Sequence, residues 1–315
     1  IIFDDYQFSA DESKILFATE TEPIYRRSTK ASYYVLHLTI KKPFSLSQGG
    51  KQSYATFSPD GSKVAFTRDN NLFYVDLNSM NEKQITTTGE WNKIIVGSTD
   101  WVYEEEFAFA KAFFWSPDSK KIAYYTFDES RVKEYNMQKW GELYPADYKF
   151  KYPKAGEDNS IVTISVYDIE NDKTVRMNIG KETDIYIPRI KWTHDPNTLS
   201  ILRMNRLQNV LEILHVNANT GKTALILKEI SPTYISINDD LTYLKKQNAF
   251  VYTSEKDGFK HLYLFDFSNK QELQITKGEW EVDEFTGIDE NSNTLYFTIT
   301  ADSPLQRQFY CIGWK

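Results

Sequence analysis

Three consecutive acids, Glu104, Glu105 and Glu106, are the residues of this sequence whose types and spacing most clearly suggest chemistry. Aromatic residues flank them, with Tyr103 before and Phe107 after. Two carboxylates about 4 Å apart repel by about 4 kcal/mol at an effective dielectric of about 20. A fold keeps such a cluster more easily when a cation neutralises it. The segment therefore predicts a cation-binding acidic site, with a solvated acidic turn as the alternative.

The backbone around these acids must leave strand geometry if neighbouring carboxylates are to face one ligand. Adjacent residues of a β-strand point to opposite faces of the sheet. We therefore expect a short helical turn at the acids, with residues 107–113 as candidates for its continuation. Trp101 and Tyr103 are expected to pack beneath the acids rather than to touch a ligand.

Four segments of the chain resemble the dipeptidyl peptidase IV family of serine exopeptidases. They occur in the family's order and cover nearly the whole chain. They are Arg26-Arg27-Ser28-Thr29-Lys30-Ala31-Ser32-Tyr33, Asp100-Trp101-Val102-Tyr103-Glu104-Glu105-Glu106 followed by Trp115-Ser116-Pro117-Asp118, Tyr152-Pro153-Lys154-Ala155-Gly156, and Gly278-Glu279-Trp280-Glu281-Val282.

The resemblance implies roles for particular residues. In the family, the second and third acids of the run bind the free α-amine of a peptide, and an arginine contacts the substrate backbone near its second residue. These positions are Glu105, Glu106 and Arg26 here, and Arg27 is the alternative for the guanidinium. An α-ammonium has a pKa of about 8 and offers three N–H donors. Two carboxylates can accept two of these donors in charge-assisted hydrogen bonds.

The resemblance also implies the architecture. Family members have an eight-bladed β-propeller packed on an α/β-hydrolase domain. Residues 1–315 are then most of the propeller, with further strands expected before the segment matching Ile1. The last blade and the hydrolase domain are expected after the segment matching Lys315.

Internal repeats predict the same all-β fold class without the family. A unit of an aromatic residue, a hydroxyl residue, a turn with Asp and a β-rich run recurs along the chain. A β-propeller of about six to seven four-stranded blades follows from the spacing of these units, and a β-sandwich is the alternative. Clear copies begin at Phe8, Phe57 and Trp115, and weaker ones at Trp192 and Ile288. A second unit is a strand followed by the beginning of the next strand, and it recurs as Leu72–Leu77 with Gln84–Thr86 and as Leu262–Phe267 with Gln274–Thr276.

One segment is longer than a turn between strands needs. Residues 128–158 interrupt the repeats, and long ordered insertions tend to be binding or assembly elements. The matching segment of the family is an arm that helps to form a homodimer. We therefore expect an inserted arm and a homodimer, with a mobile loop as the alternative.

Other kinds of chemistry have no motif in this sequence. A Gly-x-Ser-x-Gly nucleophile elbow needs two glycines four residues apart, and none of the 13 glycines has such a partner. His37 and His215 lie among aliphatic residues, so we expect structural roles for them. We expect no catalytic residue, no metal site and no cofactor, and therefore no peptidase activity from this chain alone.

Composition excludes several classes of partner. The formal net charge of −7 argues against a nucleic-acid partner. No apolar run approaches the roughly 18 residues that a membrane span needs, so we expect none. Cys311 is the one cysteine, which excludes a disulfide within the chain, and we expect it to be a small buried hydrophobic residue.

The resemblance implies that the parent protein releases N-terminal dipeptides with Pro, or less well Ala, in second place. Its propeller would screen out blocked peptides, and a downstream Ser-Asp-His triad would cleave. A bacterial periplasmic, secreted or cell-surface location is implied as well. The alternatives are a non-catalytic propeller that serves as a binding or scaffold module, and the propeller of a prolyl tripeptidyl peptidase or of an inactive homologue. The pair Glu105 and Glu106 counts against the tripeptidyl variant, whose amine anchor would lie elsewhere.

Overall fold

The computed structural model describes residues 2–314, and in that range the chain is almost entirely β-strand with one six-residue helix, α1. The chain divides into two compact units. The first contains Ile1–Arg206 and Val216–Thr223, and the second contains Leu207–His215 and Ala224–Lys315.

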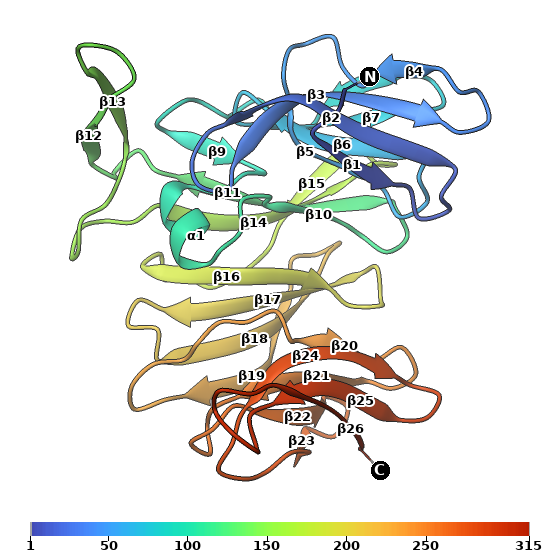
Figure 1. Cartoon of the computed structure of the whole chain (residues 1–315), viewed down its shortest axis with the longest axis vertical. Coiled ribbons are helices and arrows are strands. Elements are labelled where there is room, and N and C mark those ends of the chain that lie inside the picture. Colours follow the sequence, from blue (N-terminus) through green and yellow to red (C-terminus); the bar gives the residue numbers. More distant parts are fainter. Residues whose placement is uncertain (1, 315) are drawn as a thin grey trace. The chain divides into compact units, whose positions relative to one another are not determined.

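Strands that follow one another in the sequence pair side by side, as in propeller blades (Figure 1). Two sheets of four antiparallel strands begin the chain: β1 (Asp5–Phe8), β2 (Lys14–Pro23), β3 (Thr29–His37) and β4 (Pro43–Ser45), then β5 (Ser53–Phe57), β6 (Lys63–Arg68), β7 (Asn71–Asp76) and β8 (Asn81–Gln84). The third sheet contains β9 (Ile94–Val96), β10 (Phe113–Trp115), β11 (Lys121–Asp128), β14 (Ile161–Asp168) and β15 (Lys173–Arg176).

Three more sheets of three or four strands follow in the described chain. They are β16 (Ile185–Trp192), β17 (Thr198–Asn205), β18 (Val210–Asn217) and β19 (Thr223–Ile230); β20 (Thr242–Tyr243), β21 (Ala249–Ser254), β22 (His261–Asp266) and β23 (Gln271–Gln274); and β24 (Val282–Asp289), β25 (Thr294–Ile299) and β26 (Gln308–Gly313). Residues 2–314 thus form six sheets of three or more strands, and the predicted all-β class with four-stranded blades is confirmed.

Apolar faces of neighbouring sheets form the core. Leu16 of β2 and Val35 of β3 belong to one buried cluster with Val64 and Phe66 of β6. Alternation along each strand supplies these inward-facing residues. Burial of this kind is the main stabilising contribution to such a fold.

The aromatic–hydroxyl–Asp unit forms the same turn in its three clear copies. In the second sheet the Ser58 hydroxyl donates to Asp60 at 2.6 Å and accepts from the Lys63 amide at 3.0 Å. The turn therefore closes before β6 begins, since the side chains replace backbone partners. Equivalent bonds join Ser9 to Asp11 and Ser116 to Asp118, each at 2.6 Å.

The second recurring unit differs from its prediction. Gln84–Thr86 was expected to begin a strand, but β8 ends at Gln84. The Thr86 hydroxyl accepts the Leu72 amide at 3.0 Å, which takes the place of a ladder bond and ends the pairing. The Thr276 hydroxyl does the same for Leu262 at 2.9 Å, just after β23 ends.

The inserted segment contains a β-hairpin. Strands β12 (Glu134–Lys139) and β13 (Ala146–Lys151) pair only with each other among the described strands. Figure 1 shows the hairpin, in green, projecting away from the sheet of β11 and β14 from which it emerges. The segment thus contains two paired strands, while its part in assembly stays a prediction.

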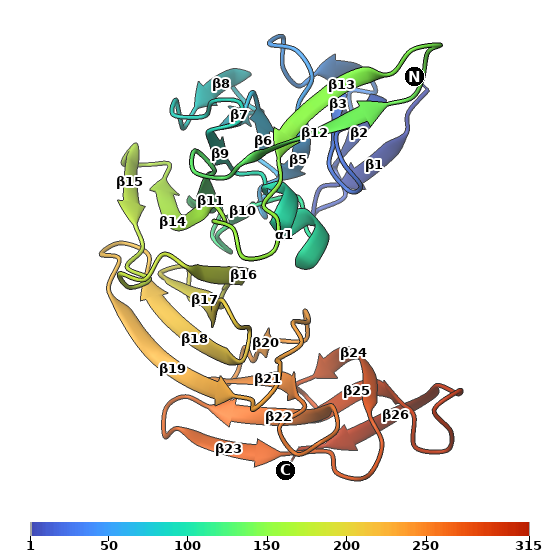
Figure 2. The same ribbon diagram turned by 90° about the vertical axis from the view of Figure 1, so that its left-hand side faces the viewer.

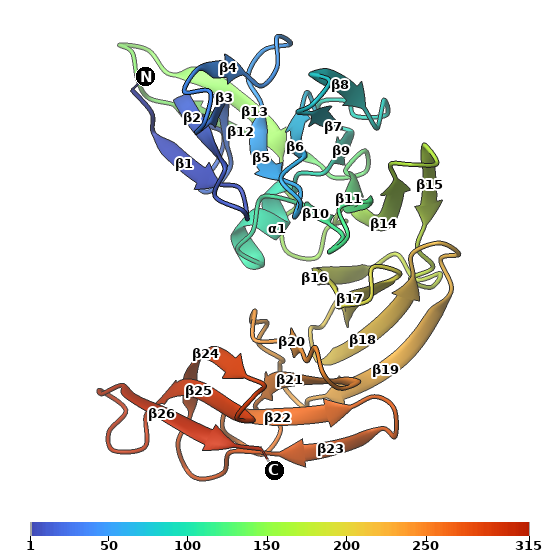
Figure 3. The same cartoon turned by 90° about the vertical axis from the view of Figure 1, so that its right-hand side faces the viewer.

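Helix α1 (Trp101–Glu106) lies between β9 and β10 in the sequence, close to β10 in Figures 2 and 3, and its Tyr103 ring packs on Phe127 of β11. The predicted helical turn at the acids is therefore confirmed. The expected continuation through residues 107–113 is wrong, because Phe107 ends the helix and Ala108 has a φ of 60°. That left-handed conformation stops the helix.

The structure also bears on the expectations for Cys311 and for a membrane span. Cys311 is exposed on β26, so its prediction as a buried residue is wrong. The strand lies at the outer side of its three-stranded sheet, with β25 as its neighbour in the described chain. Among residues 2–314, no helix has the length and apolar character needed to cross a bilayer.

Candidate functional site

An ion pair joins the first sheet to helix α1. The Nε atom of Arg26 lies 2.9 Å and 3.1 Å from the two carboxylate oxygens of Glu105. The Arg26 side chain is 71% exposed, whereas that of Glu105 is 18% exposed. Arg26 lies in the turn between β2 and β3, so two segments far apart in the sequence meet here. The structure thus brings together two of the three residues predicted for the site.

The third predicted residue, Glu106, ends the same helix. Its side chain is exposed, and it makes no hydrogen bond or ion pair with the described residues. Its charge helps to raise the pKa of the Tyr186 phenol, for which burial is the larger cause. Glu106 therefore offers a carboxylate that can still accept donors from a ligand.

The first acid of the run has a different environment. Glu104 is only 1% exposed. One of its carboxylate oxygens accepts the amide N–H groups of Arg27 at 2.5 Å and Ser28 at 2.9 Å. The three acids of the run are therefore graded from buried Glu104 through partly covered Glu105 to exposed Glu106.

Buried polar groups hold the helix in place. The Asp100 carboxylate caps α1 by accepting the Tyr103 amide at 2.9 Å, and it accepts the Ser160 hydroxyl at 2.6 Å. Burial raises the pKa of Asp100 above its usual range. The Tyr103 hydroxyl accepts the Ile187 amide at 2.8 Å within the same unit. These contacts fix the helix from its N-terminus and from beneath.

The two aromatic residues expected beneath the acids behave differently. Tyr103 is buried and packs on Phe127 of β11, with ring centroids 4.8 Å apart, so its prediction is confirmed. The Trp101 side chain is only half-buried, and its ring packs on that of Tyr152 with the ring centroids 4.3 Å apart. It also lines a cavity, so it does not simply support the acids from below.

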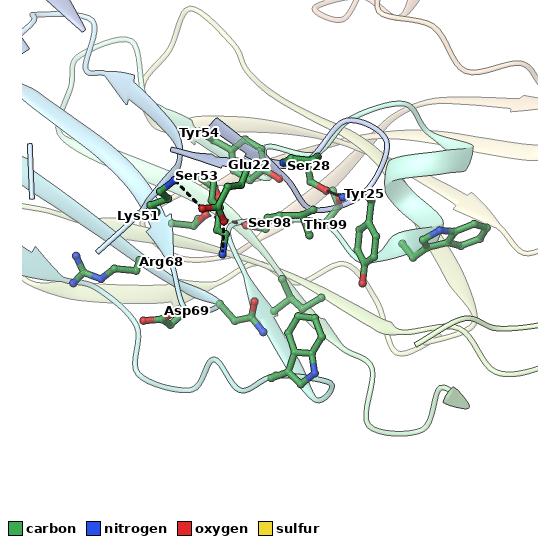
Figure 4. Close-up of a pocket in the computed structure, with 18 of the residues that line it drawn as sticks. Glu22, Tyr25, Ser28, Lys51, Ser53, Tyr54, Arg68, Asp69, Ser98 and Thr99 are labelled. Carbon is green, nitrogen blue, oxygen red and sulfur yellow. Dashed lines mark hydrogen bonds and ion pairs between the residues drawn. The ribbon is translucent and has the colours of Figure 1, made fainter. Parts of the chain in front are cut away.

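That cavity, of about 400 Å³, lies within the first unit beside the turn that carries Arg26 (Figure 4). Tyr25 and Ser28 of the turn line it. Figure 4 shows Glu22 reaching Lys51, and their ion pair is 2.8 Å long. The buried carboxyl of Glu129 also lines the cavity, and its pKa is raised to about 7, chiefly by burial and further by Asp100.

Sequence reasoning missed the roles of Glu104 and Asp100. It treated Glu104 only as part of the acidic run, and nothing in the sequence shows that its partners lie in the Arg26 turn. The N-cap role of Asp100 had a signal, because Asp directly before a helical segment is a preferred cap.

Groups of His, Cys, Asp and Glu able to hold a metal ion are absent from residues 2–314.

Comparison with known proteins decides the family. The family described as the dipeptidyl peptidase IV (DPP IV) N-terminal region matches residues 9–315. This chain belongs to that family. Among named relatives of this DPP IV N-terminal region, dipeptidyl peptidase 4 of Trichophyton rubrum is 31% identical over 331 residues, which are 98% of this chain and 42% of that protein. Dipeptidyl peptidase 4 of Arthroderma otae is 30% identical, over 99% of this chain and 42% of that protein.

A solved structure gives the same answer for the fold. The crystal structure of Porphyromonas gingivalis dipeptidyl peptidase 4 matches with a TM-score of 0.93 and 38% sequence identity, over 99% of this chain and 45% of that one. The β-propeller class predicted for this DPP IV N-terminal region is thereby confirmed. The chain spans less than half the length of these relatives, which are named as peptidases.

Proposed function

We propose that this chain is the amine-binding and substrate-gating part of a DPP IV-like serine exopeptidase. The parent enzyme would release Xaa-Pro or Xaa-Ala dipeptides from peptide N-termini. The ion pair of Arg26 with Glu105 carries the proposal, because it places a guanidinium and a carboxylate at the C-terminal end of one short helix. Glu106, the next residue of that helix, adds an exposed carboxylate. Family membership supports the peptidase class.

The chemistry of the three residues suits a free peptide N-terminus. A protonated α-amine carries one positive charge and three N–H donors. The carboxylate of Glu105 retains acceptor sites beyond those that Arg26 uses, since an ionised carboxylate has about four lone-pair positions. Glu106 adds a second acceptor. Arg26, held by Glu105, can donate from its outer nitrogens to a peptide carbonyl.

Fixing the amine would also fix where cleavage occurs. When the N-terminus is held at one point, the carbonyl of the second residue lies at a set distance from it. Binding energy at the amine would thus position the reacting carbonyl. A peptide with a blocked amine lacks both the charge and the donors, so it would be rejected. The α/β-hydrolase domain of the parent protein would supply the Ser-Asp-His triad, and this chain alone would be inactive.

The test uses the full-length natural protein. Turnover of an Xaa-Pro chromogenic substrate is compared with turnover of its N-acetylated form. We expect cleavage of the free substrate and a loss of at least about 100-fold on acetylation. Equal cleavage of both would contradict amine gating. No cleavage of either would favour a scaffold propeller or an inactive homologue.

We also propose that the arm of residues 128–158 joins two copies of the protein. Its support is the β12–β13 hairpin, which pairs only with itself among the described strands and carries the exposed residues Trp140, Leu143 and Tyr144. Exposed apolar side chains gathered in this way are typical of protein–protein contacts. The variant Trp140→Ser/Leu143→Ser should convert a dimer into a monomer in light scattering, whereas Leu305→Ser, at another exposed apolar position, should not.

The location proposed for the parent protein is the bacterial periplasm, the cell surface or the medium. Family resemblance is its support. Fractionation of the native cells, with detection of the full-length protein in the periplasmic, surface and soluble extracellular fractions, tests it. Recovery from the cytoplasm alone would contradict it.

A further inference from the structure

Glu104 is a buried carboxylate with an unusual set of partners. It is 1% exposed, and one oxygen accepts two successive backbone amides, those of Arg27 and Ser28. The other oxygen is buried and has no hydrogen-bond partner among the described residues. The backbone oxygen of Glu104 also accepts a hydrogen bond from the Nε–H group of Arg27 at 3.3 Å. All polar contacts that the structure gives this residue's side chain therefore go to one turn.

That turn is the segment that carries Arg26. It closes through the Ile24 amide, which donates to the Ser28 backbone oxygen at 2.8 Å. The Tyr25 amide donates to the Ser28 hydroxyl at 3.0 Å. Arg26 lies at its tip, one residue before the first amide that Glu104 binds. Glu104 thus binds the turn through two of its backbone amides, while Glu105, the next residue of the helix, forms an ion pair with the Arg26 guanidinium.

A buried carboxylate with an unpartnered oxygen is costly for a fold to keep. An apolar residue of similar volume would avoid the desolvation of a charge, but it would leave the two turn amides without an acceptor. The carboxylate is therefore best explained by what it does for the turn. An arginine that is 71% exposed has many conformations, and a rigid backbone beneath it reduces the freedom lost when it binds a ligand.

We propose that Glu104 is a positioning residue, which fixes the Tyr25–Ser28 turn on α1 so that Arg26 and Glu105 are prearranged for the substrate. This inference rests on the proposed amine-binding function. Glu104 itself is buried and does not touch the substrate. Its effect passes through Arg26, so the contribution of Arg26 to substrate binding depends on Glu104.

The dependence can be measured as a double-mutant cycle in the full-length enzyme. Arg26→Ala is made in the wild type and in Glu104→Leu, which keeps the volume but removes the acceptor. In the wild type, Arg26→Ala should lower kcat/KM at least about tenfold, mainly through KM. In the Glu104→Leu background, Arg26→Ala should lower kcat/KM by less than about twofold. A purely structural role for Glu104 would make the two effects multiply, and that result would overturn the proposal.

Two more variants protect the test against failure to fold. Glu104→Gln keeps an oxygen that can accept the turn amides, so it should stay within about threefold of wild-type kcat/KM. Glu104→Asp keeps the charge but withdraws the oxygen by one methylene, so it should repeat the cycle result of Glu104→Leu. Full activity and full dependence on Arg26 in Glu104→Asp would contradict the inference.

Failure of this inference differs from failure of the proposed function. If the wild type is active and the variants Arg26→Ala and Glu105→Ala keep its kcat/KM, the assignment of the amine-binding site is wrong. If both variants lose activity but Glu104 shows no coupling to Arg26, only the positioning role is wrong.

Discussion

The Nε atom of Arg26 lies 2.9 Å from the Glu105 carboxylate, although 79 positions separate the two residues in the sequence. A surface ion pair of this kind contributes little to stability, about 0–1 kcal/mol. Its value is therefore better sought in recognition than in folding. Under the proposed function, the guanidinium held by Glu105 would donate to the end of a peptide, and Glu105 and the exposed carboxylate of Glu106 would accept from it.

The first prediction separates the two neighbouring arginines. Arg26→Ala should lower kcat/KM of the full-length enzyme by about 10–30-fold, because a charged donor to the substrate backbone is lost. Arg27→Ala keeps the backbone amide that Glu104 binds, so it should stay within about threefold of the wild type. Steady-state kinetics on one Xaa-Pro substrate would decide. Equal losses in both variants would mean that the choice of Arg26 is wrong.

The second prediction concerns the stability of the helix support. Tyr103→Phe removes the hydroxyl that accepts the Ile187 amide, leaving that buried N–H without its partner. The free energy of unfolding should fall by about 1–3 kcal/mol in urea denaturation. Tyr6→Phe, at an exposed position of β1, should change it by less than about 0.5 kcal/mol. An unchanged midpoint for Tyr103→Phe would show that water or another group satisfies the amide.

The third prediction is a pH dependence from Glu129. Burial raises the pKa of this carboxyl from 4.5 to about 7, Asp100 and Asp128 add to the shift, and Lys151 opposes it. Because the pKa is higher in the folded protein, the stabilising contribution is complete below pH 4.5 and is lost as the pH rises through 7.

Unfolding free energies measured between pH 5 and 8 test that sign. Glu129→Gln should remove up to about 3 kcal/mol of the decline with rising pH. The exposed Glu142→Gln should leave the decline as it is in the wild type. A wild type whose stability rises across this range, or a Gln variant with the same slope as the wild type, would contradict the account.

Local patterns predicted more of this molecule than long-range ones. The turn in which Ser58 binds Asp60 is closed by hydrogen bonds between nearby residues, so its repeat could be recognised from the sequence. The helical turn at the acids could also be predicted from the sequence, because two neighbouring carboxylates cannot face one ligand from a strand. The end of the helix could not be predicted, since Ala108 takes a left-handed conformation that no property of alanine favours.

The site shows the same limit. Arg26 and Glu105 were assigned by family resemblance, and the structure brings them together. The amide contacts of Glu104 depend on how the β2–β3 turn meets α1, and the sequence carries no signal for that register. Cys311 was misjudged for a related reason, because exposure on an outer strand is set by which strand lies beside it.

The most direct test of the account removes one charge at a time from the amine site. Glu105→Gln and Glu106→Gln are made in the full-length protein, and kcat/KM is measured on a free and an N-acetylated Xaa-Pro substrate. Each variant should lose about 30–150-fold on the free substrate, corresponding to about 2–3 kcal/mol for one charged anchor. Both should show a smaller ratio between free and acetylated substrates than the wild type. Wild-type rates and an unchanged ratio in both variants would show that the acids do not bind the amine.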